Sequence, residues 1–237
     1  MSERRPPLFA VLIDADNIPA KYAEPILKEI TSFGEPALRR VYGDWSSGRL
    51  KPWSEKVRAL GLIAYQETSN TTGKNASDIG LVIDAMDILH SGRFEGFVLV
   101  SSDSDFTRLA ARIRENGLEV IGIGERKTPE SLRNVCNRFI FLENIIEDAE
   151  PRPKGKPGGK PGAAPGDAAR LIRDAMDKVD PEGEWFPLGL IGQTITAAHP
   201  DFDTRTYGCR KLSDLVGQLR QFELRRTGNA IEVRRLD

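Results

Sequence analysis

Before residue 150 the sequence alternates between short apolar runs and amphipathic stretches, and this alternation leaves few possible architectures. The clearest apolar run, LFAVLI at 8–13, has no polar residue, as expected for a strand that is covered on both faces. Further strands are predicted at 38–43, 62–67, 96–102, 118–124 and 139–144. Helices are predicted between them, at 20–33, 52–60, 77–90, 104–116 and 129–136. This order predicts an α/β fold in which helices flank a parallel sheet with right-handed crossovers.

A segment rich in proline and glycine interrupts this alternation. Residues 151–166 read PRPKGKPGGKPGAAPG and contain only proline, glycine, alanine and basic residues. Because such a segment has almost nothing to bury, we expect a flexible linker at 150–166 between domains at 1–149 and 167–237. Its cations either keep a spacer soluble or contact phosphate groups: Arg152, Lys154, Lys156 and Lys160.

The pattern after the linker is different. Three amphipathic helices are predicted at 167–179, 187–198 and 210–221. Two strand-like stretches, 222–227 and 230–235, flank Gly228-Asn229 and predict a β-hairpin. Three helices followed by a terminal hairpin are typical of a small winged-helix domain.

Composition excludes several classes of site. The chain has 237 residues, 39% of them hydrophobic, and a net charge of −1, so no overall preference for polyanions is indicated. Two cysteines without CxxC spacing and two histidines predict neither a disulfide framework nor a zinc site. The N-terminus lacks the apolar stretch of a signal peptide, and no apolar run reaches membrane-spanning length. We therefore expect a cytoplasmic protein without a membrane partner.

Aspartates gather where the predicted strands end. The first strand runs into Asp14 and Asp16 of LIDADN, and the fourth into Asp103 and Asp105 of SSDSDF. Asp78 stands at the start of the helix that precedes the fourth strand. Ligands of open parallel sheets bind at the carboxyl ends of the strands, near the point where the strand order reverses. If the first and fourth strands are neighbours, Asp14, Asp103 and Asp105 face one another and Asp78 lies above them.

Carboxylates placed so close together repel one another unless a cation or shared protons neutralise them. Oxygen ligands suit Mg²⁺ or Mn²⁺, and such an ion activates water and stabilises charge on a phosphodiester. A purely structural alternative exists for the residues at helix starts. Ser77 and Ser104 are expected to be N-caps, and Asp78 and Asp105 would then complement helix dipoles.

These motifs resemble the NYN branch of the PIN-like nuclease superfamily, the bacterial LabA-like group. The resemblance covers about residues 8–145 and rests on LIDADN, SSDSDF and the Lys74-xx-Ser77-Asp78 segment. It implies a Rossmann-like sheet and a metal-dependent ribonuclease that hydrolyses phosphodiester bonds in single-stranded or structured RNA. The implied metal-binding and catalytic acids are Asp14, Asp78, Asp103 and Asp105, with Asn17 orienting the metal shell or a phosphate. Asp16 is a weaker candidate, and Asp84 and Asp87 are expected to be solvated or to support the site indirectly.

The last part of the chain resembles the OST-HTH, or LOTUS, domain. The similarity covers about 167–236 and rests on Trp185-Phe186-Pro187-Leu188, on Pro200-Asp201-Phe202-Asp203 and on the segment from Tyr207 to Leu215. It implies a module that binds RNA or a protein partner and that adds no catalytic residue. Both Trp185 and Phe186 are expected in its core.

Charge is unevenly distributed in this second domain. Residues 167–203 hold 3 basic and 8 acidic side chains, a net of −5, whereas 205–235 hold 8 basic and 3 acidic, a net of +5. The basic half is either a phosphate-binding surface or one side of a solvated dipole. Near the acidic crevice, Arg126 and Lys127 are further candidates, and Trp45 and Trp53 either stack on bases or pack under a loop. The residues expected to bind RNA are Lys74, Arg108, Arg205, Arg210, Lys211, Arg225 and Arg226.

Two alternatives to a nuclease stay open. A haloacid-dehalogenase-like phosphatase also places DxD after its first strand, with Asp14 as nucleophile and Asp16 as acid/base partner. Asn17 and the position of Asp78 favour the nuclease. The other alternative is an RNA-binding adaptor that does not catalyse a reaction.

Overall fold

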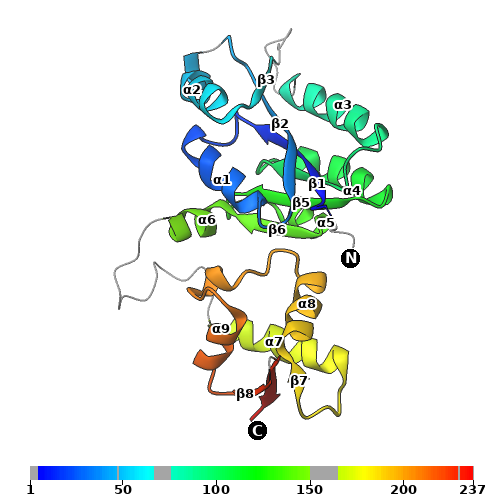
Figure 1. Cartoon of the computed structure of the whole chain (residues 1–237), viewed down its shortest axis with the longest axis vertical. Coiled ribbons are helices and arrows are strands. Elements are labelled where there is room, and N and C mark those ends of the chain that lie inside the picture. Colours follow the sequence, from blue (N-terminus) through cyan, green and yellow to red (C-terminus); the bar gives the residue numbers. More distant parts are fainter. Residues whose placement is uncertain (1–4, 47, 67–75, 150–164, 229, 237) are drawn as a thin grey trace. The chain divides into compact units, whose positions relative to one another are not determined.

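The chain folds into two compact units, Met1–Ala149 and Glu150–Asp237, which we describe separately (Figure 1). The computed structural model describes residues 5–46, 48–66, 76–149, 165–228 and 230–236, and only the main chain of 76–78, 147–149 and 165. Lys74 and the linker cations lie outside the described residues.

The first unit is built on a six-stranded parallel sheet of order β3-β2-β1-β4-β5-β6. Its strands are β1 (Leu8–Asp14), β2 (Glu35–Gly43), β3 (Ile63–Gln66), β4 (Gly96–Val100), β5 (Glu119–Gly124) and β6 (Arg138–Phe141). The predicted α/β class is confirmed, and the order reverses between β1 and β4, the two most central strands.

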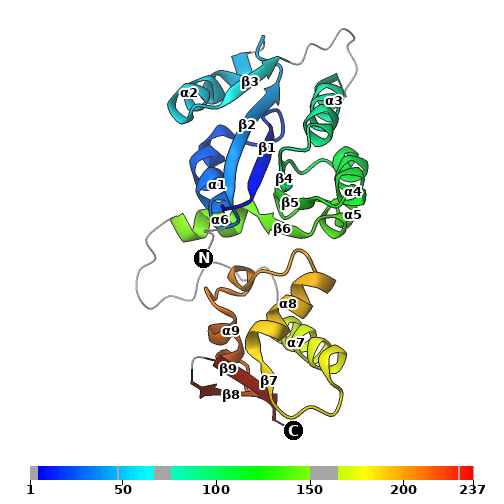
Figure 2. The same cartoon turned by 45° about the vertical axis from the view of Figure 1, so that its right-hand side comes forward.

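Helices cover both faces of this sheet (Figure 2). One apolar core lies between the sheet and α1 (Ala23–Ile30), α2 (Lys51–Leu60) and α6 (Leu142–Ala149). The other lies beneath α3 (Ala76–His90), α4 (Thr107–Glu115) and α5 (Glu130–Val135). All five residues of β4 are buried, which explains why a covered strand reads as a continuous apolar run.

Several predicted elements have other bounds in the structure, and two of them differ most in kind. The helix expected at 20–33 is divided into a 3-10 turn, η1 (Ala20–Tyr22), and α1, which begins at Ala23. Pro25 has no N–H to donate, so it fits only in the first turn of a helix. The strand expected at 139–144 stops at Phe141, because the following residues form α6.

The second unit has three main helices and a small antiparallel sheet. Its elements are α7 (Pro165–Val179), β7 (Phe186–Pro187), α8 (Leu188–Ala198), η4 (Thr204–Tyr207), α9 (Leu212–Gln218), β8 (Phe222–Thr227) and β9 (Ala230–Arg235). The predicted hairpin is β8–β9, and β7, which was not predicted, pairs with β9 to complete the order β7-β9-β8. Buried apolar residues from the helices and the sheet form one core.

Gly124 allows β5 to approach β4 where both strands reach the candidate site. A Cβ at this position would lie 2.7 Å from the Ser101 carbonyl oxygen and 2.7 Å from Thr128 Oγ1. Gly124→Ala should therefore lower the free energy of unfolding by about 1–3 kcal/mol, measured by urea denaturation. Gly48→Ala is the matched control, because a Cβ there meets no atom within 4 Å. Equal urea midpoints of unfolding for the two variants would contradict the close packing of Gly124 against Ser101 and Thr128.

The two cysteines, Cys136 and Cys209, are free and buried. Burial raises the pKa of the Cys136 thiol to about 12, although Arg114 opposes the shift. Burial is also the main cause of the raised pKa of Cys209. Since the thiolate is the reactive form, native protein at pH 8 should label with iodoacetamide far more slowly than protein unfolded in urea. Mass spectrometry of the labelled protein measures this, and equal rates in both states would show that the thiols are accessible.

Candidate active site at the carboxyl edge of the sheet

The two main aspartates lie at the ends of neighbouring strands, as predicted. Asp14 is the last residue of β1, and Asp103 follows Val100, the last residue of β4, after two serines. The two strands pair in parallel from Phe9↔Gly96 to Ile13↔Val100. The register therefore brings both acids to the same edge of the sheet.

Ser101 links Asp14 to the segment that carries Asp103. Its hydroxyl donates to Asp14 Oδ2 at 2.8 Å and accepts a hydrogen bond from the Asp103 N–H at 3.1 Å. Asp14 and Ser101 are both buried, with exposed fractions of 7% and 4%. A buried carboxylate needs such donors, because it has lost most of its hydration. Sequence reasoning missed Ser101, although its position directly after β4 is a usable signal.

Asn17 joins the same two strand ends. Its N–H donates to Asp14 Oδ1 at 3.1 Å, and its side-chain oxygen accepts from the Ser102 N–H at 3.2 Å. These bonds fix the orientation of the amide, and its nitrogen makes no hydrogen bond to the described part of the chain. Asn17 is therefore oriented at the site by two hydrogen bonds, and within the described residues its amide nitrogen stays available as a donor.

Asp103 caps the 3-10 helix η3 (Ser104–Phe106), which leads into α4. Its Oδ1 accepts from the Asp105 N–H at 2.9 Å. The prediction that Ser104 is the N-cap is wrong, since the extended conformation needed at a cap falls on Asp103. Asp105 is exposed in the first turn of η3.

The acids of this edge supply only carboxylate oxygens, the donor type that suits Mg²⁺ or Mn²⁺. Asp78 belongs to the first turn of α3, but its side chain lies outside the described residues. Among the side chains that are described, no three acidic, histidine or cysteine residues gather closely enough to hold a metal ion. The donor chemistry thus fits the expected ion, and Asp14, Asp103 and Asp105 do not form a three-ligand group by themselves.

The Asp16 side chain contacts the segment that follows β2. Its Oδ2 accepts from the Asp44 N–H at 3.1 Å, and its Oδ1 lies 3.9 Å from Arg49 Nη2. This placement does not favour the phosphatase alternative, which needs Asp16 to act beside Asp14.

Asp44 is an acid at this edge that sequence reasoning missed. It directly follows β2, so the rule that selected Asp14 and Asp103 also applies to it. Hydrogen bonds from Ser46, and then from Gln66, lower the pKa of the Asp44 carboxyl. Asp44 thus holds the loop after β2 next to Asp16.

The other acids of α3 have separate positions. Asp84 accepts hydrogen bonds from Arg40 and from the Tyr42 hydroxyl, both on β2. Asp87 is exposed. Asp84 is therefore an anchor between α3 and the sheet, and Asp87 is solvated.

The cations and aromatic residues near the crevice differ in availability. Arg108 is exposed on α4, whereas Arg126 bonds to Asn144 and Lys127 pairs with Glu125. The packing alternative holds for the tryptophans: Trp53 is buried and donates to the Ile18 carbonyl at 2.7 Å, and Trp45 donates to the Tyr65 carbonyl at 2.8 Å.

In the second unit, several predicted RNA contacts are engaged in ion pairs. Arg205 pairs with Asp203 at 2.7 Å with both side chains 14% exposed, and Arg225 pairs with Glu232 at 2.7 Å. Arg210, Lys211 and Arg226 are exposed. Phe186 lies in the core as predicted.

For Trp185 the core prediction is wrong. Trp185 is only half-buried, and the guanidinium carbons of Arg225 and Arg234 lie 3.9 and 4.9 Å from its ring centroid. Its ring forms cation–π contacts on the sheet instead of filling the interior.

This architecture, a doubly wound parallel sheet with paired acids at its carboxyl edge, defines a Rossmann-like, PIN-like class of protein. The NYN domain model matches residues 9–143, and the chain belongs to this family. The OST-HTH/LOTUS domain model matches residues 165–233. The first unit thus has a nuclease-type fold, and the second is a module of an RNA-binding type.

Comparison with solved structures supports the fold. A protein of unknown function from Vibrio parahaemolyticus has a similar crystal structure, with a TM-score of 0.51 and 20% sequence identity over 61% of this chain and 98% of that chain. None of the curated proteins compared with the chain matches it. Within the described parts of the chain, no helix is both long and apolar enough to cross a membrane.

Proposed function

We propose that this protein is a metal-dependent ribonuclease that hydrolyses RNA phosphodiester bonds. The observation that carries the proposal is the Asp14–Ser101–Asp103 arrangement, in which one hydroxyl joins the Asp14 carboxylate to the main-chain N–H of Asp103 at the neighbouring strand end. A cluster of carboxylates is stable beside a divalent cation, and the NYN fold gives such a cluster a precedent among nucleases.

Each residue has a defined part in this proposal. Asp14, Asp78, Asp103 and Asp105 would hold Mg²⁺ or Mn²⁺, and the cation, when bound, would activate a water and neutralise phosphate charge. Ser101 and Asn17 keep the Asp14 carboxylate oriented through their bonds to its two oxygens. The spare amide donor of Asn17 then binds a phosphate oxygen of the substrate.

The OST-HTH/LOTUS domain binds the RNA outside the active site in this proposal. Three of its exposed cations are the contacts that we assign to phosphate groups: Arg210, Lys211 and Arg226. Arg205 is unsuited to this role because its guanidinium is engaged by Asp203. A protein partner on the same domain is the competing possibility, and RNA binding by the separate 165–237 segment tests it.

A cleavage assay tests the proposal directly. Labelled single-stranded RNA is incubated with the protein and Mn²⁺ or Mg²⁺, with EDTA as control and a phosphomonoester substrate in parallel. We expect RNA products only with metal. Turnover of the phosphomonoester without RNA cleavage would establish the phosphatase, and RNA binding without cleavage under any metal would establish the adaptor.

A further inference from the structure

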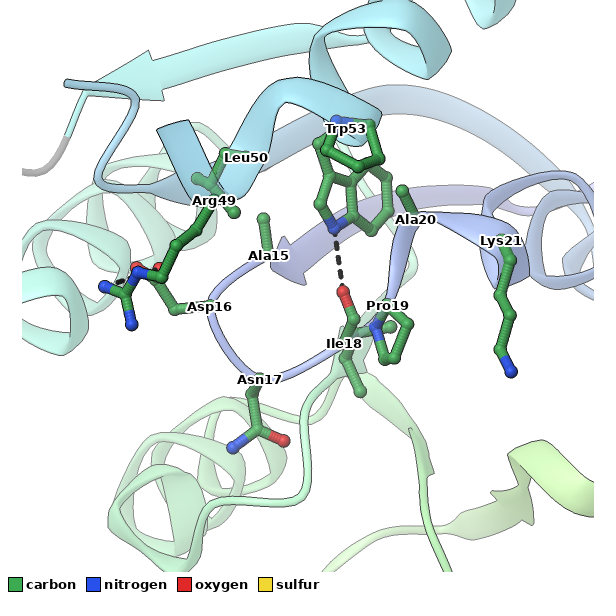
Figure 3. A pocket seen from close by; sticks show the side chains of 11 residues that line it. Ala15, Asp16, Asn17, Ile18, Pro19, Ala20, Lys21, Arg49, Leu50 and Trp53 are labelled. Carbon is green, nitrogen blue, oxygen red and sulfur yellow. Dashed lines mark hydrogen bonds and ion pairs between the residues drawn. The ribbon is translucent and has the colours of Figure 1, made fainter. Parts of the chain in front are cut away.

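A pocket of about 390 Å³ opens beside the candidate active site, at the loop that follows β1 (Figure 3). Its wall is largely apolar: Ile18, Leu50 and Trp53 form the buried part of this wall, and Pro19 and Pro52 form the exposed part. The Trp53 indole N–H donates to the Ile18 carbonyl at 2.7 Å, which fixes two parts of this wall to each other. The pocket is therefore preformed rather than created by side-chain movement.

The rim of the pocket is polar and carries cations. Arg49 and Lys21 both line it and are exposed, Arg49 with 78% of its side chain. Asp16 also lies at the rim, 3.9 Å from the Arg49 guanidinium, so it limits where Arg49 reaches (Figure 3). An apolar interior with cations at the mouth suits a ligand that has a flat apolar part and a phosphate.

Asn17 belongs to this pocket and to the candidate active site at once. It lines the pocket, while its N–H and its side-chain oxygen are bonded to Asp14 and to the Ser102 N–H. A ligand in the pocket therefore lies next to the acids that we assign to cleavage. The two sites are also adjacent along the chain, since Ala15, which lines the pocket, directly follows Asp14.

We propose that this pocket binds one nucleotide of single-stranded RNA beside the phosphate that is cut. The base lies against the exposed part of the wall, Pro19 and Pro52, and Arg49 binds the adjoining phosphate. Pockets of roughly 300–1,000 Å³ hold small organic ligands, so one nucleotide matches the available space. Base contacts with apolar and aromatic walls tolerate any sequence, whereas phosphate contacts set the position of the strand.

This inference rests on the proposed ribonuclease function, and it is tested by binding so that the two can fail separately. The chain has three tryptophans, so its indole N–H signals are few in an NMR spectrum. Trp45→Phe and Trp185→Phe assign the third signal to Trp53. With EDTA present, uridine or adenosine 5′-monophosphate should shift the Trp53 signal, because its acceptor Ile18 lines the pocket. Ribose 5-phosphate, which lacks a base, should shift it much less at equal concentration.

Two variants, each of which removes one positive charge, test the phosphate contact. Arg49→Gln should weaken nucleotide binding about tenfold, as expected for one lost charge-assisted hydrogen bond. Arg49→Gln should also reduce the slope of log affinity against log salt concentration by about 0.7, measured for a single-stranded oligoribonucleotide in EDTA. Arg58→Gln is the control, because Arg58 is exposed on α2, the helix that begins two residues after Arg49, but does not line the pocket.

The outcomes are separable. If Arg49→Gln and Arg58→Gln have the same affinity and salt slope, or if ribose 5-phosphate shifts Trp53 as strongly as the nucleotides, the pocket is not a nucleotide site. If nucleotides bind as expected but wild-type protein never cuts RNA with metal, the binding site stands and the ribonuclease function fails. RNA cleavage that is normal in Arg49→Gln, with unchanged binding, would leave the function standing and overturn the pocket assignment.

Discussion

Asp103→Asn should lower the rate of metal-supported RNA cleavage at least about 100-fold while leaving the protein folded. Even residues that only orient metal ligands commonly contribute 10–100-fold, roughly, so a direct ligand should have at least that effect. Asparagine keeps the shape and the oxygen that accepts from the Asp105 N–H, and it is as good an N-cap as aspartate. The loss should therefore come from the missing negative charge and be measured as initial cleavage rates with Mn²⁺.

Two controls give this experiment its specificity. Asp87→Asn makes the same chemical change at an exposed position of α3 and should cleave like wild type. Asp16→Asn should be milder than Asp103→Asn, because the Asp16 carboxylate is engaged by the Asp44 N–H. A phosphatase would reverse that order, since Asp16 would be its general acid. Full RNA cleavage by Asp103→Asn would show that the activity comes from another site or from a contaminant.

The position of the main acids was predictable because it depends on features that are local in the sequence. A strand covered on both faces reads as an unbroken apolar run, so the ends of β1 and β4 were visible at Asp14 and near Asp103. That these strands are neighbours was an expectation, and the pairing Ile13↔Val100 confirms it. The class of fold and the edge that carries the acids thus followed from strand and helix patterns.

The connections within the site were not predictable, because they join residues that are distant in the sequence. The Ser101–Asp14 hydrogen bond spans 87 positions, and the bond from Asp44 to Asp16 spans 28. Which residue caps η3 depended on the backbone conformation of Asp103, with φ −86° and ψ 128°. No composition or spacing rule specifies that conformation.

The charges of the second unit also depend on contacts between residues that are distant in the sequence. Its sequence separates into acidic and basic halves, yet folding pairs them with each other. Arg234 reaches Glu184 at 2.9 Å and Arg235 reaches Asp177 at 2.5 Å. A charge count along the chain therefore overstates the positive surface that remains for phosphate groups.

Asp84 is a further acid whose position depended on tertiary contacts. From the sequence, Asp84 was expected to be solvated or to support the site indirectly. Its partners, Arg40 and Tyr42, come from β2 and are brought to α3 by the sheet. The side chains of Arg40 and Asp84 are 20% and 18% exposed, so this is a largely desolvated ion pair.

Arg40 and Tyr42, the two β2 residues, both use the Asp84 carboxylate as a hydrogen-bond acceptor. Burial, and then the bond to Asp84, raise the pKa of Tyr42 far above its usual value, so the phenol stays protonated and donates. Arg40 also lies over the Tyr65 ring, with its guanidinium carbon 4.7 Å from the ring centroid, and its Nε has no hydrogen-bond partner among the described residues. Without Asp84, the guanidinium would have no compensating charge in this position.

Asp84→Ala should consequently lower the free energy of unfolding by about 3 kcal/mol, because it leaves a buried cation and a buried hydroxyl without their acceptor. Asp87→Ala, one turn further along α3 and exposed, should change it by less than about 0.5 kcal/mol. Urea denaturation of both variants measures the difference.

In the background of Tyr42→Phe, Asp84→Ala should lower the free energy of unfolding by less, since one of the two donors to Asp84 is already absent. Equal unfolding midpoints for the Asp84 and Asp87 variants would mean that Asp84 does not anchor α3. Since α3 also carries Asp78, a destabilised anchor should weaken Mn²⁺ binding in Asp84→Ala even at temperatures where the protein stays folded.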